Sequence, residues 1–468
     1  MMQKRITSRM SKQDPSKHER YKSSYKANDY YWGVGIELET YLQFDTPNPM
    51  NAWAIHSNHK RERYSVDYFT GLQPEYKDHL KKLFPDGLTS LPLYINSHSF
   101  QHTDVLGNHR TTYAKVPKPN PAFTETIHET LCKANPAIFK DKYKVNYTYD
   151  GDTIEFMTQD FYKATVKGAV AELIREKKLY LDALNKADLF PDLGALKYPV
   201  VNEPFVTFLT NEKNVAIFNN GTYHFNFTLP TLLDAKKEPA NITLFIQQHK
   251  AAIRYIQYIE PLLLAVYGTP DPFSKVSDKF SKASQRCAVS RYIGIGTYDT
   301  NAMKPGKILQ IDRKSCPQAQ NDFWWYTTYT KDSCYVPLEE IGVDINFNKH
   351  GAHGIELRFF DWFPEEKLEE IMTILVHVLD VSLKYGCPDD PTMCPIWNGL
   401  VVKVLQGGDV LLTRGEYEMY SRIFRLNNPP FLCWLFKAPF SKPNTVTKVW
   451  KDIVKAVKKV KGPCSKVM

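Results

Sequence analysis

One short segment, Gly35-Ile36-Glu37-Leu38-Glu39, places two carboxylates where they could hold a metal ion. Successive side chains of a β-strand point to opposite faces, so Glu37 and Glu39 share one face while Ile36 and Leu38 share the other. Two neighbouring carboxylates repel each other, and burying them is costly unless a cation compensates their charge. A divalent ion such as Mg²⁺ takes carboxylate oxygens, often together with a phosphate. The alternative is an ordinary strand with one face in solvent.

Two later segments place further metal-binding or polar groups in predicted strands. Asp150-Gly151 is typical of a tight turn between two strands, and Glu155 lies within the second of them. In another alternating segment, His224 and Asn226 share a face that is opposite to a row of aromatic residues. Each signal is weak alone, because a single Glu or His in a strand is more often a solvent-facing or structural residue.

The last charged strand is predicted at 354–360, where Glu356 and Arg358 share one face. A helix is predicted directly after it, at about 364–385, because Pro and Glu occupy its first turn. An arginine such as Arg358 can bind a phosphate through two parallel hydrogen bonds. Arg291, in a basic loop region, is a further candidate for a phosphate contact, although most arginines of this kind simply lie at the surface.

The elements that position these residues divide the chain into three parts. Residues 1–28 are rich in Lys and Arg and are expected to be a basic arm, disordered or extended. Residues 29–440 contain all of the charged strands and form the expected main domain, with 45–140 as an insertion. Residues 441–468 predict a basic amphipathic helix. That helix could bind a membrane surface or an acidic partner, or it could pack as an ordinary terminal helix.

The composition favours a globular protein with much β structure. Of the 468 residues, 43% are hydrophobic, and 28 Tyr and 26 Phe favour strands. The eight Cys residues form no C-x-x-C pair and no spacing typical of zinc. No secretory signal and no run of about 18 apolar residues is present, so we expect a cytoplasmic protein without a membrane span. The net charge of +9 is concentrated in the two tails, which could contact an acidic partner, a membrane surface or nucleic acid.

Taken in chain order, the charged strands resemble the glutamine synthetase/glutamate–cysteine ligase superfamily of carboxylate–amine ligases. They are most similar to its amidoligase branch, which occurs in bacteria, fungi and large DNA viruses. The matching segments are 35–39 (G-I-E-L-E), 150–155 (D-G-D-T-I-E), 223–226 (Y-H-F-N) and 354–358 (G-I-E-L-R). The resemblance implies an α+β fold in which a curved, mostly antiparallel sheet holds the site and helices pack on its convex side.

The resemblance also implies an ATP-dependent ligase that uses Mg²⁺ or Mn²⁺. It would join a carboxylate of an amino acid, peptide or protein to an amine through an acyl phosphate. Arg358 and Glu356 would be catalytic, with Arg358 on the transferring phosphate, and Arg291 and Asn226 would help to bind ATP. The residues that would ligate two or three metal ions are Glu37, Glu39, Glu155, His224 and Glu356.

Two other interpretations remain open from the sequence alone. A structural or binding protein could retain this fold without activity and use its basic tails to contact an acidic partner, a membrane surface or nucleic acid. A dedicated nucleic-acid binder is favoured only by the tails, because no aromatic motif of the RNA-binding type is present. Association with a virion would follow if the source were a large DNA virus, and the oligomeric state is left open.

Overall fold

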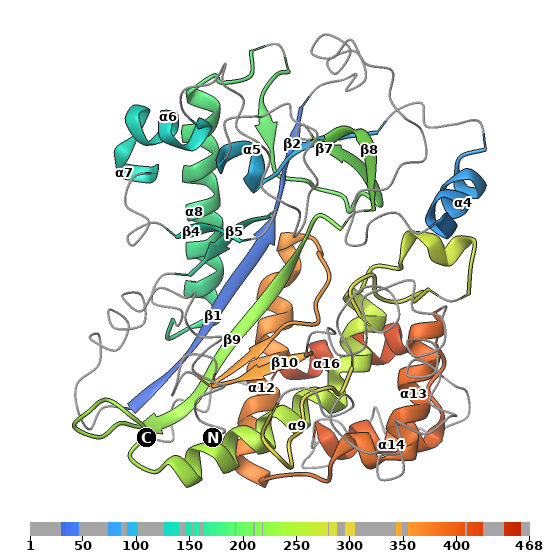
Figure 1. Cartoon of the computed structure of the whole chain (residues 1–468). Helices are drawn as coiled ribbons and strands as arrows, with labels where there is room; N and C mark the ends of the chain where they lie inside the picture. Colours follow the sequence, from blue (N-terminus) through green and yellow to red (C-terminus); the bar gives the residue numbers. More distant parts are fainter. Residues whose placement is uncertain are drawn as a thin grey trace, which may run out of the picture.

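The computed structural model shows an α+β protein in which two long strands form the centre of the main sheet (Figure 1). The described residues are 30–45, 74–85, 91–101, 126–139, 146–150, 153–158, 163–191, 193–208, 211–217, 219–278, 280–287, 295–304, 343–348, 354–407, 410–424 and 444–459. The expected basic arm at 1–28 lies outside them, as does Arg291.

The main sheet has six strands, and every pair of neighbours is antiparallel. In spatial order its strands are β10 (Ile345–Phe347), β11 (Ile355–Leu357), β9 (Gly221–Leu232), β1 (Tyr30–Thr40), β5 (Thr153–Met157) and β4 (Tyr147–Asp150). All four segments with charged residues therefore lie in one sheet, on β1, β5, β9 and β11. The hairpin predicted around Asp150-Gly151 is present as β4 and β5.

A second sheet of five strands continues from the end of β1. Its order is β6 (Leu196–Lys197), β2 (Leu42–Phe44), β3 (Leu93–Ile95), β7 (Phe205–Phe208) and β8 (Asn211–Ile217). Only the pair of β3 and β7 is parallel. Strand β3 comes from the region 45–140, so this region supplies part of the second sheet. That the region is an insertion stays a prediction.

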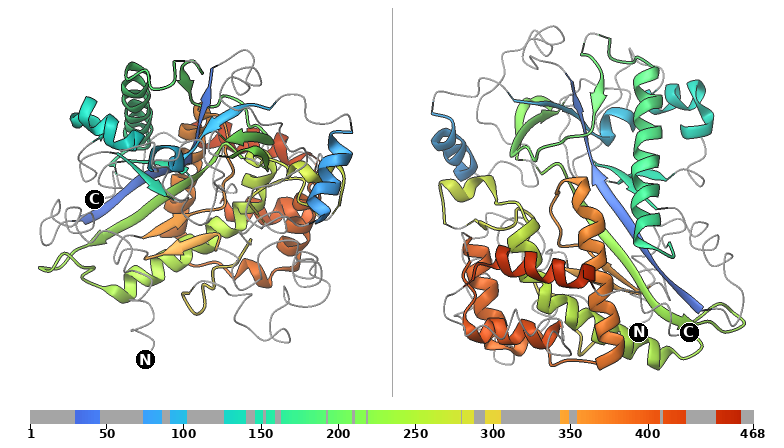
Figure 2. Two further views of the ribbon diagram at one scale, coloured as in Figure 1. Left: turned by 45° about the horizontal axis from the view of Figure 1, so that its top comes forward. Right: turned by 180° about the vertical axis from the view of Figure 1, so that it is seen from behind.

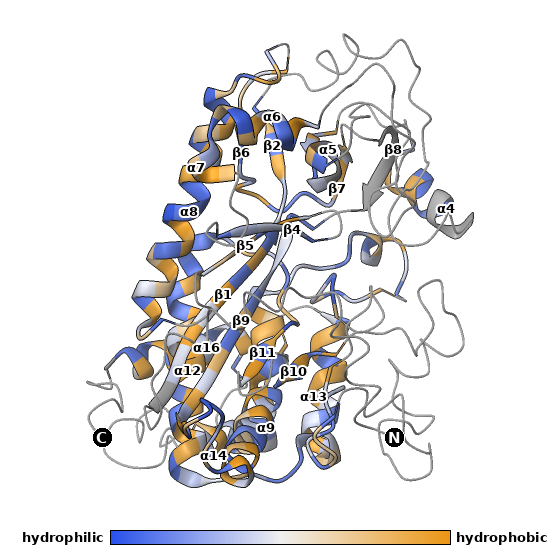
Figure 3. Cartoon of the chain, turned by 60° about the vertical axis from the view of Figure 1, so that its left-hand side comes forward, coloured by the Kyte–Doolittle hydropathy of each residue, from blue (hydrophilic) through white to orange (hydrophobic). Residues whose placement is uncertain are grey.

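Three long helices cover the apolar face of the main sheet: α8 (Val166–Lys186), α9 (Ile242–Tyr267) and α12 (Leu368–Tyr385). Figures 1 and 2 show α8 beside one half of the long strands, and α9 with α12 beside the other half. The alternation of side chains explains this arrangement, and Figure 3 shows it along β1 and β9. Ile36, Leu38 and Phe225 are at most 1% exposed on the helix-covered face.

Smaller helices complete the described part of the chain. They are α4 (Pro74–Leu83), α5 (Ser97–Gln101), α6 (Ile127–Ala134), α7 (Pro136–Phe139), η2 (Pro272–Lys275), η6 (Glu365–Lys367), η7 (Pro391–Met393), α13 (Pro395–Gln406), α14 (Arg414–Ile423) and α16 (Val446–Lys459). The predicted helix at 364–385 is found as η6 followed by α12. It ends at Gly386, whose φ of +75° is a backbone conformation that glycine adopts without strain.

The C-terminal helix α16 packs into the protein core. Val449, Trp450 and Ile453 are 1–3% exposed, and α16 contacts both α9 and α12. The Trp450 indole Nε1 donates a hydrogen bond to the Tyr267 hydroxyl at 2.8 Å. Of the two roles that the sequence left open for this helix, the structure shows packing as a terminal helix. Within the described ranges, every helix is too short or too polar to cross a membrane.

Candidate metal centre

The strand register places the charged side chains in adjacent rows on the face of the sheet opposite to Ile36 and Leu38. Glu37 on β1 lies directly opposite His224 on β9. Glu39 lies opposite Glu155 on β5. Asn226 on β9 lies opposite Glu356 on β11. Residues that are directly opposite in an antiparallel pair share a face, so strands far apart in the sequence present these groups together.

Three of these residues, Glu37, His224 and Glu356, form a compact buried group. Each offers one ligand atom, and the three atoms lie within 4.8 Å of one another. The His224 Nδ1 atom is 3.6 Å from Glu37 Oε2 and 3.5 Å from Glu356 Oε1. All three residues are at most 3% exposed. Two buried carboxylates side by side are costly without a cation, and this donor set of oxygens and an imidazole suits a divalent ion.

Hydrogen bonds hold the two carboxylates of this group in place. Asn226 Nδ2 donates to Glu37 Oε1 at 3.2 Å. Asn346 Nδ2, from β10, donates to Glu356 Oε2 at 2.8 Å. In each case the bond engages the carboxylate oxygen that does not face His224. Such outer contacts orient ligands and are typical of metal sites. Asn346 was not predicted as a site residue, although the alternation of its segment places it on the same face as Glu356.

Glu39 lies next to the compact group, and its side chain is an ionised carboxylate. Its Oε1 atom is 4.0 Å from His224 Nε2, and its Oε2 atom accepts a hydrogen bond from the Thr222 hydroxyl at 2.7 Å. Burial alone would raise the pKa of Glu39. The nearby guanidinium charges of Arg286 and Arg358 and the hydrogen bond from Thr222 act against burial, and the pKa of Glu39 is lowered to about 2. Glu39 is therefore a carboxylate over the whole physiological range.

Two arginines enter the site, and only one was predicted. Arg358 Nη1 donates to Glu356 Oε1 at 3.0 Å, and the Arg358 side chain is 24% exposed at the rim. Arg286 is 2% exposed, and its Nη2 atom is 3.1 Å from His224 Nε2. Its Nη1 atom is 3.7 Å from Glu39 Oε2. Arg286 comes from a basic loop without periodicity, so only its membership in the same basic region as Arg291 could have indicated it.

Asp361 fixes the backbone of the loop that carries Arg286. The Asp361 carboxylate accepts hydrogen bonds from the backbone N–H groups of Arg286, at 2.9 Å, and Thr269, at 3.0 Å. Burial raises the pKa of Asp361 to about 6, and these hydrogen bonds oppose the rise. Asp361 thus anchors the backbone of Arg286, while the guanidinium of Arg286 reaches the charged face of the sheet.

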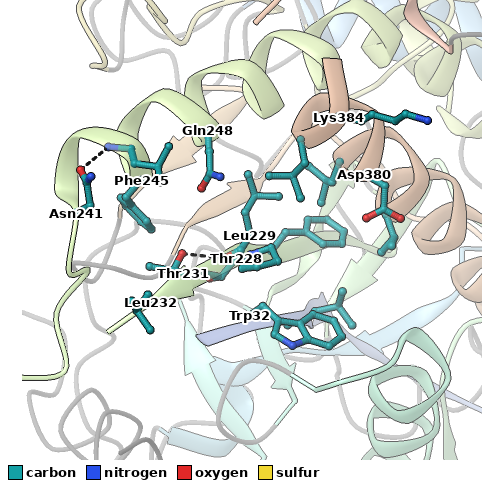
Figure 4. Close-up of a pocket in the computed structure, with 18 of the residues that line it drawn as sticks. Trp32, Thr228, Leu229, Thr231, Leu232, Asn241, Phe245, Gln248, Asp380 and Lys384 are labelled. Carbon is teal, nitrogen blue, oxygen red and sulfur yellow. Dashed lines mark hydrogen bonds between the residues drawn. The ribbon is translucent and has the colours of Figure 1, made fainter. Parts of the chain in front are cut away.

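A large apolar pocket lies elsewhere, between the helix-covered face of the sheet and the helices α9 and α12 (Figure 4). Its volume is about 890 Å³, and Leu229, Phe245 and Leu379 line it. None of the charged residues of the candidate centre lines this pocket. Although large apolar pockets are common ligand sites, the charged residues of the candidate centre lie on the opposite face of the sheet.

Comparisons with known proteins found a relative in sequence and, among similar solved structures, a weakly similar enzyme. No protein-family model matches the chain. A bifunctional glutathione synthetase from Pasteurella multocida is similar in structure with a TM-score of 0.34 and 11% identity, over 92% of this chain and 50% of that one. The chain thus spans half the length of that enzyme, and a likeness of this size supports no conclusion about fold or activity.

The sequence relative is much closer. "Uncharacterized protein R704" of Acanthamoeba polyphaga mimivirus is 41% identical over 410 residues, which cover 87% of this chain and 72% of the relative. An identity of this level over most of both chains shows common descent. The chain therefore belongs to the same protein family as mimivirus protein R704.

Proposed function

We propose that this protein is a metal- and ATP-dependent carboxylate–amine ligase. The observation that carries the proposal is the compact buried group of Glu37, His224 and Glu356, whose ligand atoms lie within 4.8 Å of one another. The antiparallel sheet, with this group on one face and helices on the other, supports the ligase fold that the sequence resemblance implies. The substrates would be a carboxylate of an amino acid, peptide or protein and an amine.

The reaction class explains why such a centre is needed. A carboxylate is a poor acyl donor, so transfer of the γ-phosphoryl group of ATP would first convert it to an acyl phosphate. The amine would then displace the phosphate and form the amide. Bound at the centre, Mg²⁺ or Mn²⁺ would neutralise negative charge on the phosphates during the transfer.

The ligands of the ion would come from three strands of the main sheet and from their neighbours on the same face. Glu37, His224 and Glu356 would hold the ion, and Glu39 and Glu155, which are opposite each other on β1 and β5, would extend the ligand set. Hydrogen-bond donors on the outer oxygens of Glu37 and Glu356 orient these carboxylates, and the inner oxygen of Glu356 accepts from Arg358, which the ion would displace.

Arg358 and Asn226 would act next to the ligands. Arg358 is the more exposed of the two arginines, so its guanidinium would meet the transferring phosphate at the rim of the centre. Asn226 would act by positioning Glu37, to which its amide donates. The contacts of Asn226 and Arg291 with ATP stay predictions, and Arg291 lies outside the described residues.

Phosphate release tests this function. The purified protein is incubated with ATP, Mg²⁺ or Mn²⁺ and pooled amino acids, polyamines and small peptides as donors of carboxylates and amines. We expect release of phosphate that requires both a compound with a carboxylate and a compound with an amine, and that stops when EDTA removes the metal. An excess of Mn²⁺ over EDTA should restore the release. Absence of metal-dependent ATP turnover with every pair, together with absence of ATP and Mn²⁺ binding, would contradict the proposal.

A further inference from the structure

The position of Arg286 indicates which contact a metal ion would have to displace at the candidate centre. Arg286 is buried, and its guanidinium contacts both His224 and Glu39. Its Nη2 atom is within hydrogen-bond distance of His224 Nε2, while His224 Nδ1 faces Glu37 and Glu356. The same imidazole therefore has a cation at one nitrogen and two carboxylates at the other.

Hydrogen-bond chemistry determines which nitrogen of His224 carries a proton in this arrangement. A guanidinium is always protonated and only donates. His224 Nε2 must therefore accept the hydrogen bond from Arg286, and the ring proton of a neutral imidazole must be on Nδ1. A proton on Nδ1 is also favourable there, because it points towards two carboxylates.

A metal ion cannot bind His224 while this hydrogen bond is in place. Ligation through Nδ1 would move the ring proton to Nε2, where it would meet an N–H group of Arg286 3.1 Å away. Ligation through Nε2 would require the guanidinium to leave the position that it occupies. In both cases the hydrogen bond between Arg286 and His224 is lost when an ion is ligated.

We propose that Arg286 competes with the divalent ion for His224. This inference rests on the proposed metal centre. Without the ion, Arg286 holds His224 Nε2 and lies beside Glu39, while Arg358 pairs with Glu356; when the ion binds, Arg286 releases His224. Because its backbone is anchored to Asp361 and its Nη1 atom lies 3.7 Å from Glu39, the side chain keeps an anionic partner after the release. Arg286 thus lowers the affinity of the centre for metal.

Titration with Mn²⁺, followed by the electron paramagnetic resonance of the free ion, tests this competition without measuring activity. Arg286→Met removes the charge and keeps most of the side-chain length. A lost hydrogen bond to a charged group corresponds to about a tenfold change or more, so Arg286→Met is expected to bind Mn²⁺ at least about tenfold more tightly than the wild type. Arg414→Met serves as the matched control and should not change the affinity, because the Arg414 side chain is exposed on α14 and pairs with Glu418.

The outcomes separate this inference from the proposed function. Equal or weaker Mn²⁺ binding by Arg286→Met, with clear binding by the wild type, overturns the competition and leaves the metal centre intact. Absence of Mn²⁺ binding by both proteins overturns the metal centre and the inference with it. Loss of the tighter binding in Arg286→Met/Glu356→Gln would assign the gain to this centre, and its retention would overturn the inference.

A measurement on the wild type covers the case in which Arg286→Met does not fold. The nitrogen chemical shifts of ¹⁵N-labelled histidine report which ring nitrogen carries the proton, and a His224→Asn variant assigns the signal. We expect a proton on Nδ1 in the metal-free protein and a loss of this pattern when diamagnetic Mg²⁺ is added. A proton on Nε2 in the metal-free protein would overturn the inference.

Discussion

Replacing Glu356 by glutamine is expected to lower metal-dependent ATP turnover by about 10²-fold or more, the scale of a lost preorganised charge at an active site. Glutamine has nearly the same shape as glutamate, but one carboxylate oxygen becomes an NH₂ group, which cannot ligate a metal. Glu356 Oε1 lies 3.5 Å from His224 Nδ1, so the variant removes the negative charge and one ligand oxygen from one of the three groups that converge on the proposed ion. Mn²⁺ affinity should fall together with turnover, as measured by titration and by phosphate release.

The stability of this variant distinguishes a functional centre from a structural cluster of ion pairs. Glu356→Gln loses the charge partner of Arg358, which is partly solvated, but it also relieves the repulsion between Glu356 and Glu37. These opposing effects should leave the free energy of unfolding within about 1 kcal/mol of the wild type. Glu366→Gln, at an exposed glutamate of η6, is the matched control and should change neither turnover nor stability. Wild-type turnover in Glu356→Gln would contradict the assignment.

Replacing Trp450 by alanine is expected to lower the free energy of unfolding by about 3–5 kcal/mol. The Trp450 side chain is 1% exposed, its ring packs edge-on against Tyr267 at 5.9 Å, and its Nε1 atom donates to the Tyr267 hydroxyl. The variant creates a large cavity between α16 and α9 and leaves the hydroxyl without that donor. Urea denaturation of the full chain, followed by far-ultraviolet circular dichroism, measures the effect.

This variant also tests the role of the C-terminal helix. Lys455→Ala, at an exposed position of the same helix, is the control and should change stability by no more than about 0.5 kcal/mol. If α16 served a membrane surface and packed only weakly on α9, Trp450→Ala and Lys455→Ala would both leave the unfolding curve unchanged. That result would reject the packing of α16 as a source of stability.

The faces of the strands could be predicted from the sequence, because alternation depends only on local geometry. Side chains alternate along a strand with a period of two residues, so Glu37 and Glu39 point to one face and Ile36 and Leu38 to the other. The structure places Ile36 and Leu38 in the core. The register between strands could not be derived in this way. Glu37 lies opposite His224 because β1 pairs with β9. In the sequence, all five strands of the second sheet come between these two strands, so local patterns carry no information about their pairing.

Other features could not be predicted, because the residues around them show no regular pattern or are too few to show one. Strands β6 and β3 have two and three residues, which is too short to show alternation. Arg286 lies in a loop without periodicity and reaches the centre only through the fold, where Asp361 anchors its backbone. The amphipathic pattern of the C-terminal helix predicted an apolar face, but not that Tyr267 of α9 would lie against it.

Diffraction from crystals grown with Mn²⁺, recorded at a wavelength where manganese scatters anomalously, tests the central claim most directly. We predict an anomalous peak among Glu37, His224 and Glu356, at about 2.1 Å from carboxylate oxygens and an imidazole nitrogen. Glu356→Gln crystals grown in the same way should lose or weaken the peak. Absence of a peak at these residues in the wild type, at a Mn²⁺ concentration that supports turnover, would contradict the metal centre.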